Sequence, residues 1–183
     1  MTLEEQKAAA RKAAFARRKE VHGPHPAAGH LSSFLAGHRG VPVAGYMPIN
    51  TEIDPLPAME EAAAHGPVGV PVIEAAATPL KFARWEPGIP MVEGAFKAHI
   101  PADLSFFEPE IVIVPLVAFT RDGGRLGYGG GFYDRTLEGL RAKRPTLAAG
   151  FAYAAQEAEA LPLEPTDQPL DLIITEAGII DLR

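Results

Sequence analysis

Residues 111–143 read IVIVPLVAFTRDGGRLGYGGGFYDRTLEGLRAK, and they carry the clearest structural pattern of the chain. Residues 111–119 form the strongest apolar run of the chain, and their β-branched side chains favour a strand covered on both faces. Residues 133–143 predict a helix. A glycine-rich turn separates the two, so the stretch is a strand, a turn and a helix in succession.

Strands and helices alternate on both sides of this unit. Helices are predicted at residues 3–20, with Gly23 and Pro24 as stop signals, and at 58–65. Strands are predicted at the short apolar stretches 41–47, 68–73, 80–85, 147–153 and 170–175. The alternation predicts an α/β fold with a largely parallel sheet. The loops at 86–110 are long and Pro-rich, which is typical of a binding surface.

The composition excludes several classes of protein. The chain has 183 residues, 47% apolar and 22% charged, which excludes a mainly disordered chain, a collagen and a coiled coil. The lack of cysteine excludes disulfides, a thiol nucleophile and a thiolate metal site. A net charge of −6 disfavours general nucleic-acid binding. Because no apolar run approaches the ~20 residues of a membrane span and no signal peptide is visible, we expect a cytoplasmic protein that binds no membrane.

Charge is distributed unevenly along the chain. Residues 1–20 contain six basic and three acidic residues, whereas residues 151–183 contain seven acidic residues and only Arg183 as a base. The two ends could meet at a site that binds an anion and a metal, or they could form two separate solvated surfaces.

The glycine-rich turn has the composition of an anion-binding loop. Backbone N–H groups of residues 127–131, together with the N-terminus of the following helix, can surround an anion. Arg125 could contact phosphate oxygens, and Asp134 could hold Mg²⁺ beside them. The turn is neither a Walker A loop nor a Rossmann fingerprint, since Phe132 stands where the latter needs Gly or Ala. The alternative is a flexible loop in which Asp134 caps the helix.

Residues 125–135, RLGYGGGFYDR, resemble the signature of the 5-formyltetrahydrofolate cyclo-ligase (5,10-methenyltetrahydrofolate synthetase) family, Arg-Leu-Gly-x-Gly-x-Gly-Tyr-Tyr-Asp, with Phe132 in place of the first Tyr. The preceding residues 114–119 are also similar to the family's strand. The resemblance implies one three-layer α/β/α domain over residues 1–183, with a mainly parallel sheet. It implies an enzyme that uses ATP and Mg²⁺ to cyclise 5-formyltetrahydrofolate to 5,10-methenyltetrahydrofolate, releasing ADP and phosphate.

The resemblance also implies an ATP site. Lys7 and Arg11 match an N-terminal Lys-x-x-x-Arg, and residues four apart share one helix face; the alternative is a solvated basic helix. Arg125 and Tyr133 are the implied catalytic residues. The implied ATP-binding residues are Lys7, Arg11, Arg125, Leu126, Gly127, Tyr128, Gly129, Gly130, Gly131, Phe132 and Tyr133.

A folate site is implied by two further segments. Residues 46–52, YMPINTE, resemble the segment where the family places an apolar residue and a Glu against the folate, so Met47 and Glu52 are candidates. A carboxylate can accept two parallel N–H bonds from a pterin-like edge. Trp85 resembles the family's aromatic residue in the same pocket, although a lone Trp is also a common core residue. The implied folate-binding residues are Met47, Glu52, Trp85, Tyr128 and Tyr133.

Magnesium is expected to bind to two carboxylates. Residues 165–171, PTDQPLD, resemble a His-Asp…Leu-Asp stretch of the family, with Thr166 where many relatives carry His. The implied ligands are Asp134 and Asp167, with Asp171 as the rival of Asp167. The alternative for each carboxylate is a cap on a loop turn.

Residues 20–40 depart from the family, which has a plainer helical pattern there. The stretch is rich in Gly, Pro and His and contains one short apolar piece at 31–35. Irregular spacing favours exposed histidines that bind no metal. These histidines are His22, His25, His30 and His38.

Two other functions are compatible with parts of the pattern. The first is a divergent nucleotide-binding regulatory module of the same fold without cyclo-ligase activity. The second is an α/β sugar-phosphate isomerase or transferase, which would need an acid/base carboxylate pair and no ATP. For the cyclo-ligase, a monomer is expected, with 5-formyltetrahydrofolate as its partner.

Overall fold

The computed structural model describes residues 1–164 and 167–183. Its centre is an eight-stranded sheet of order β12-β11-β10-β7-β1-β2-β3-β6. The strands of this sheet are β1 (Val43–Ala44), β2 (Val68–Val72), β3 (Lys81–Arg84), β6 (Phe106–Phe107), β7 (Ile111–Pro115), β10 (Leu147–Phe151), β11 (Leu172–Ile174) and β12 (Ile179–Asp181). The five strands from β11 to β2 are parallel, and the outer three pair antiparallel. The expectation of a mainly parallel α/β sheet is confirmed.

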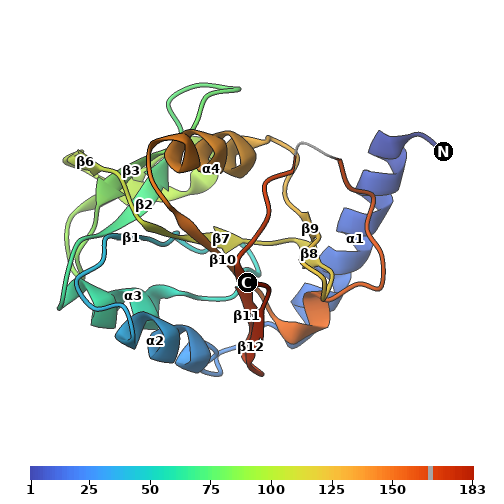
Figure 1. Cartoon of the computed structure of the whole chain (residues 1–183), viewed down its shortest axis with the longest axis horizontal. Helices are drawn as coiled ribbons and strands as arrows, with labels where there is room; N and C mark the ends of the chain where they lie inside the picture. Colours follow the sequence, from blue (N-terminus) through green and yellow to red (C-terminus); the bar gives the residue numbers. More distant parts are fainter. Residues whose placement is uncertain (165–166) are drawn as a thin grey trace.

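Helices cover both faces of the sheet and give three layers. Figure 1 shows α4 (Phe132–Lys143) on one side of the sheet, and α2 (Gly29–Ala36) and α3 (Leu56–Ala63) on the other. The helix α1 (Leu3–Val21) lies at one end, next to the strands β8 (Ala118–Phe119) and β9 (Arg125–Leu126). Short 3₁₀ turns η1 (Ala95–Lys97) and η2 (Ala154–Gln156) complete the described helices.

The strand β7 explains why the sheet has two buried faces. Ile111 and Ile113 pack in the cluster that contains residues of α2 and α3. Val112 and Val114 pack in the cluster that contains Leu137 of α4. Successive side chains of a strand point to opposite faces, so a continuous β-branched run fits a strand covered on both sides.

The apolar run 111–119 is not one strand, which corrects the expectation. The strand β7 ends at Pro115, and Ala118 and Phe119 form β8, which pairs with β9 in a separate two-stranded ribbon. Proline has no N–H with which to continue a ladder, so the chain can leave the sheet there. This departure carries the glycine-rich turn away from the sheet and towards α1 (Figure 1).

The helices lie close to their predicted positions, whereas some strands differ: the strand predicted at 41–47 is only Val43–Ala44. The capping box of Thr2 and Glu5 starts α1 one turn before its basic residues. The piece at 31–35 belongs to the eight-residue helix α2. Within the Pro-rich stretch 86–110, the structure has a hairpin of β4 (Met91–Glu93) and β5 (His99–Pro101), together with β6. Among the described residues, no helix has the length and apolar character needed to cross a membrane.

The histidines of residues 22–38 lie near protein groups or at the surface. His22, His25 and His30 are exposed, and His38 is half-buried. His22 Nδ1 lies 3.1 Å from the hydroxyl of Tyr153, and His38 Nδ1 lies 3.0 Å from the carbonyl oxygen of Phe34.

Candidate functional site

A cavity of about 1010 Å³ lies between α1, the glycine-rich turn and the tip of the β4–β5 hairpin. Residues that follow β1 and β2, and Pro115 at the end of β7, contribute to its wall. In open α/β sheets, ligands bind outside the carboxyl ends of the strands. The cavity brings together all but one of the site residues expected from sequence: Lys7, Arg11, Met47, Glu52, Arg125, Leu126, Gly127, Tyr128, Gly129, Gly130, Gly131, Phe132, Tyr133, Asp134 and Asp167.

Trp85 is the exception. Its side chain is buried with Met59, Val68 and Val70, and it lines a separate hollow of about 220 Å³. The backbone N–H of Trp85 donates to the carbonyl of Val68, so the chain here continues beside β2. The side chain packs in this hydrophobic cluster and does not line the larger cavity. Trp85 is therefore not retained among the proposed folate-binding residues.

The glycine-rich turn needs its glycines at two positions. Gly129 has a φ of 101° and Gly131 a φ of 68°, in the left-handed region that side chains with a Cβ disfavour. Gly131 is the residue before α4, so the turn leads directly into a helix N-terminus. The carbonyl of Gly127 accepts a 2.8 Å bond from Arg11 Nε, which fixes the turn against α1.

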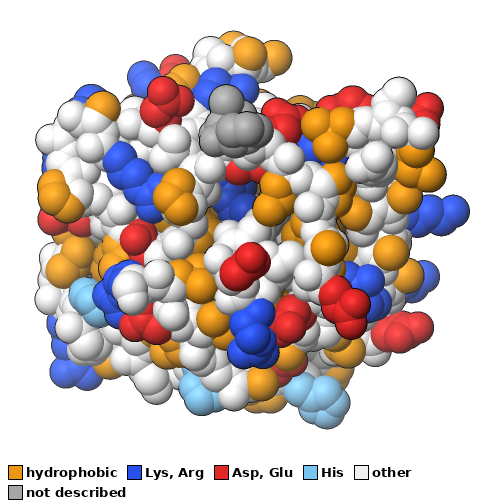
Figure 2. Space-filling model, turned by 45° about the vertical axis from the view of Figure 1, so that its right-hand side comes forward, with side chains coloured by type: hydrophobic (Ala, Val, Ile, Leu, Met, Phe, Trp, Pro, Cys, Tyr) orange, Lys and Arg blue, Asp and Glu red, His pale blue; other side chains and the backbone are white. Residues whose placement is uncertain are grey.

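The basic start and the acidic end of the chain do meet here. Lys7 forms an ion pair with Glu164, and both residues line the cavity. Arg17 Nε donates to the carbonyl of Ala155 at 2.9 Å, which holds α1 against the C-terminal half a second time. On the face shown in Figure 2, acidic and basic side chains are interspersed, which agrees with mutual pairing.

Arg125 and Asp134 form the central ion pair of the site. Arg125 is 9% exposed and pairs with Asp134, nine residues later at the start of α4. Asp134 Oδ1 also accepts a 2.8 Å bond from the N–H of Gln168, and Arg125 Nε points to the Gln168 carbonyl at 3.4 Å. The backbone of Gln168 therefore contacts both partners.

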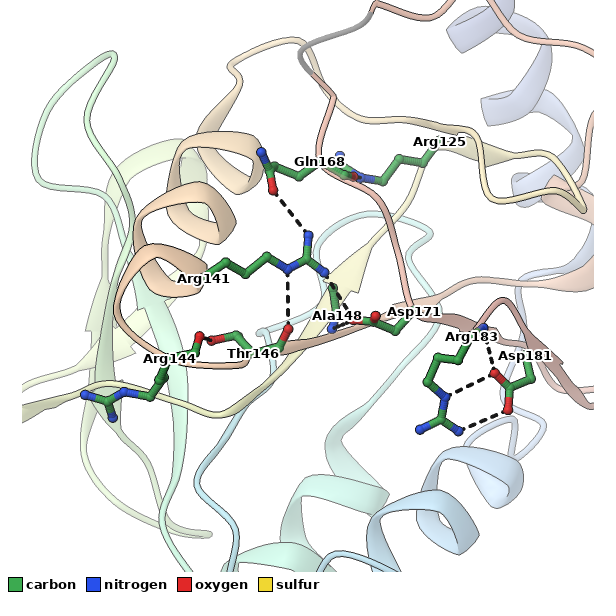
Figure 3. A network of polar contacts seen from close by, with 9 residues as sticks. All are labelled: Arg125, Arg141, Arg144, Thr146, Ala148, Gln168, Asp171, Asp181 and Arg183. Atoms are coloured by element: carbon green, nitrogen blue, oxygen red, sulfur yellow. Dashed lines mark hydrogen bonds and ion pairs between the residues drawn. The ribbon is translucent and has the colours of Figure 1, made fainter.

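A second arginine, Arg141, contacts the side chain of Gln168. Arg141 of α4 donates to the side-chain oxygen of Gln168 at 3.2 Å and to Asp171 at 3.1 Å (Figure 3). Asp171 also accepts the N–H of Ala148 at 2.7 Å. Asp171 is thus a structural carboxylate outside the cavity wall, whereas Asp167 is part of that wall. Thr166, where many family members carry His, lies outside the described residues.

The carboxylates fit magnesium that is shared with phosphate. Mg²⁺ is usually held by one or two carboxylates together with substrate phosphates and waters. Asp134 and Asp167 both line the cavity next to the glycine-rich turn. In the described part of the chain, no three His, Asp or Glu side chains gather as a metal cage. Two carboxylates in one cavity wall fit a metal ion that would take its remaining ligands from phosphate and water.

A second part of the cavity wall is built around Glu52, which is 5% exposed. Its Oε1 accepts the N–H of Ile49 at 2.8 Å, and its Oε2 accepts the hydroxyl of Tyr128 at 2.8 Å. Burial raises the pKa of Glu52, while the Ile49 N–H, the Tyr128 hydroxyl and the charge of Arg18 oppose this rise. Burial also raises the pKa of Tyr128 and of Tyr133, so both hydroxyls stay protonated at neutral pH.

Sequence reasoning missed several residues of this wall. The hairpin tip contributes Phe96 and Lys97, which have φ values of 55° and 62°. Phe96 is 73% exposed at the mouth of the cavity. The only signal was the Pro-rich character of residues 86–110, which indicated a binding surface but no particular side chain.

Residues 3–176 match the model of the 5-formyltetrahydrofolate cyclo-ligase family. The 5-formyltetrahydrofolate cyclo-ligase of Escherichia coli strain K12 is 35% identical over 144 residues, which are 75% of this chain and 79% of that protein. The one from Haemophilus influenzae is 42% identical over 101 residues, 52% of this chain and 54% of that protein. The NMR structure of Aquifex aeolicus 5,10-methenyltetrahydrofolate synthetase has a TM-score of 0.74 at 28% identity, covering 97% of this chain and 93% of that one. The chain therefore belongs to the 5-formyltetrahydrofolate cyclo-ligase family, as the motif at residues 125–135 predicts.

Proposed function

We propose that this chain uses ATP and Mg²⁺ to cyclise 5-formyltetrahydrofolate to 5,10-methenyltetrahydrofolate, with release of ADP and phosphate. The observation that carries this proposal is the presence of two chemically different parts in the wall of one cavity. One part has a glycine-rich turn with Lys7, Arg11 and Arg125, which suits a triphosphate. The other part has Glu52, which suits the N–H groups of a pterin-like ring as an acceptor.

The proposed chemistry makes a poor leaving group into a good one. The formyl oxygen attacks the γ-phosphorus, the bond to the bridging oxygen breaks and ADP leaves. N10 of the folate then attacks the resulting imidate carbon, loses its proton, and phosphate departs with the former formyl oxygen. The protein supplies orientation and charge neutralisation, and no side chain has to act as a general base.

The charged residues have separate tasks in this scheme. Arg125, Lys7 and Arg11 offset the negative charge of the phosphates. Asp134 and Asp167 would hold Mg²⁺, which supplies further neutralisation of phosphate charge when bound. Arg125 and Asp134 form an ion pair with each other. On binding, a phosphate would become the partner of Arg125, and the metal would become the partner of Asp134.

The folate is proposed to lie against Met47, Glu52, Tyr128 and Tyr133. Met47 offers an apolar contact, and the protonated hydroxyl of Tyr133 offers a donor beside Arg125. We also propose that residues 1–183 act as one domain in which α1 completes the ATP site. A monomeric state and a cytoplasmic location stay predictions.

The test is a spectrophotometric assay of the purified chain with 5-formyltetrahydrofolate, Mg²⁺ and ATP. Growth of the near-ultraviolet band of the methenyl product, absent when ATP is omitted, is the expected result. A flat trace from folded protein that still binds ATP would overturn the proposal in favour of a nucleotide-binding regulatory module.

A further inference from the structure

Arg18 is a buried charge that does not line the cavity. It lies on about the same face of α1 as Lys7 and Arg11, further along the helix, and only 1% of it is exposed. Burying a charge is costly unless it is hydrogen-bonded. Within the described residues, no carboxylate forms an ion pair with Arg18; its partners are the hydroxyls of Thr51 and Tyr128. A buried guanidinium group is thus bonded to neutral hydroxyls where a carboxylate would be expected, and this choice of partners needs a physical reason.

The direction of the hydrogen bonds supplies that reason. A guanidinium group can only donate. Arg18 donates to the Tyr128 oxygen at 2.8 Å, so the single hydroxyl hydrogen of Tyr128 is free to point the other way, to Glu52 Oε2 at 2.8 Å. The two hydrogen bonds, from Arg18 to Tyr128 and from Tyr128 to Glu52, therefore run in one direction and end on a carboxylate in the cavity wall.

Glu52 receives a donor on each oxygen. The Tyr128 hydroxyl approaches Oε2, and the Ile49 N–H approaches Oε1. Both contacts favour the ionised form, which only accepts and still has lone pairs for a ligand. A protonated Glu52 would instead present its own hydrogen and lose one acceptor position.

We infer that Arg18 is a positioning residue that directs the Tyr128 hydroxyl hydrogen to Glu52 and so keeps Glu52 an acceptor for a ligand edge with paired N–H donors. The inference rests on the proposed function, because it places the folate ring at Glu52. It adds a residue that controls specificity on α1, the helix that also brings Lys7 and Arg11 to the wall of the same cavity.

The groups that face Glu52 support this assignment. Burial favours the neutral carboxyl, and the charge of Arg18 opposes it. The other titratable neighbours are phenols: Tyr128 from the turn, Tyr46 after β1 and Tyr133 from α4. Burial raises the pKa of all three tyrosines, so they stay uncharged at neutral pH, and Arg18 is the charged group among these neighbours.

The test compares Arg18→Met with Lys19→Met, which removes an exposed charge from the same helix turn. We expect Arg18→Met to weaken 5-formyltetrahydrofolate binding, measured without ATP, by about tenfold or more, because a hydrogen bond to a charged group is lost. The KM for ATP should stay within about twofold, and Lys19→Met should change neither value. Arg18→Lys, which keeps the charge, should restore part of the binding.

Tyr128→Phe protects the test against misfolding of the Arg18 variant, since it removes one oxygen and leaves Arg18 in place. It should weaken folate binding to a similar extent, and the double variant should be no worse than either single one. Additive losses would overturn the inference, because they would mean that Arg18 and Tyr128 act separately.

Two readouts separate positioning from a merely structural role. In Arg18→Met, folate affinity should fall more steeply than in wild type as the pH is lowered towards the raised pKa of Glu52. A folate analogue without the 2-amino group should bind wild type more weakly than the parent, and Arg18→Met should discriminate less between the two. If Arg18→Met weakened the binding of the parent folate and of the analogue by the same factor, the inference would be overturned.

The inference and the proposed function fail in different ways. A wild-type chain that neither binds nor cyclises 5-formyltetrahydrofolate would overturn the proposed function. A wild-type chain that does both, with unchanged folate affinity in Arg18→Met and Tyr128→Phe, would overturn only the role of Arg18.

Discussion

Two parts of the cavity wall are organised in opposite ways. Around the glycine-rich turn, charged side chains are paired with each other, as in Arg125 with Asp134 and Lys7 with Glu164. Around Glu52, the donors already point at the buried carboxylate. A phosphate at the first part would have to replace existing partners, whereas a ring edge at the second part would find acceptors already in place. The first part would depend on exchange of charges, and the second on pre-organised hydrogen bonds.

The largest effect is expected from Arg125→Ala, which removes the ion pair with Asp134 beside the glycine-rich turn. Turnover should fall by about a hundredfold or more, because a donor that stabilises phosphate charge is lost. The thermal midpoint should fall little, since Asp134 keeps the N–H of Gln168 as a partner. Arg121→Ala, at an exposed ion pair on the same connection, is the control and should retain activity. Losses of stability as large as the losses of turnover would show that Arg125 is structural.

The part of the wall around Glu52 is probed by Glu52→Gln through the pH dependence of stability. Burial raises the folded-state pKa of Glu52 above its ordinary 4.5. Its contribution to stability is therefore full below the unfolded pKa and is lost as the pH rises through the folded pKa. The free energy of unfolding of Glu52→Gln should gain on that of wild type between acidic and neutral pH, measured by denaturant titration at each pH. A constant difference across that range would show that Glu52 is not desolvated as described.

The smallest effects are expected at glycines and separate the turn from the helix that follows it. Gly129→Ala places a Cβ at a φ of 101° and 3.2 Å from the Arg11 guanidinium, so it should destabilise by about 1–2 kcal/mol and raise the KM for ATP several-fold. Gly139→Ala is the matched control inside α4, where a Cβ meets nothing within 4 Å. It should stabilise by roughly 0.5–1 kcal/mol and leave activity unchanged, as measured by thermal unfolding and the cyclisation assay.

Much of the fold could be predicted because its signals are local. The β-branched run of β7 and the helical composition of α1 and α4 each involve residues close in sequence, and all three elements are present. Where prediction was wrong, the pairing of strands decided the structure. Ala118 and Phe119 look like a continuation of β7, yet they leave the sheet and pair with β9 across the following turn. The edge strands β6 and β12 are short and gain their identity only from the neighbours with which they pair.

The candidate site shows the same division. The turn at residues 127–131 identifies itself, because its glycines permit left-handed backbone at Gly129 and Gly131. Trp85 and Arg18 do not identify themselves. The sequence made Trp85 a candidate for the cavity and gave Arg18 no role, whereas the structure places Trp85 in the core and links Arg18 to Glu52. The direction of a side chain after a strand or along a helix depends on what packs against it.

The family motif, the parallel α/β class and most residues of the glycine-rich turn could be read from the sequence alone, because composition and backbone preference act over a few residues. Only the packing of the folded chain showed that Asp167 lies in the cavity wall and that Asp171 is bonded to the backbone of Ala148. It also decided that a buried arginine of the first helix contacts the hydroxyl that faces Glu52, 34 residues further along the chain. Such contacts follow from the packing of distant segments, which fixes both the distance and the direction of each hydrogen bond.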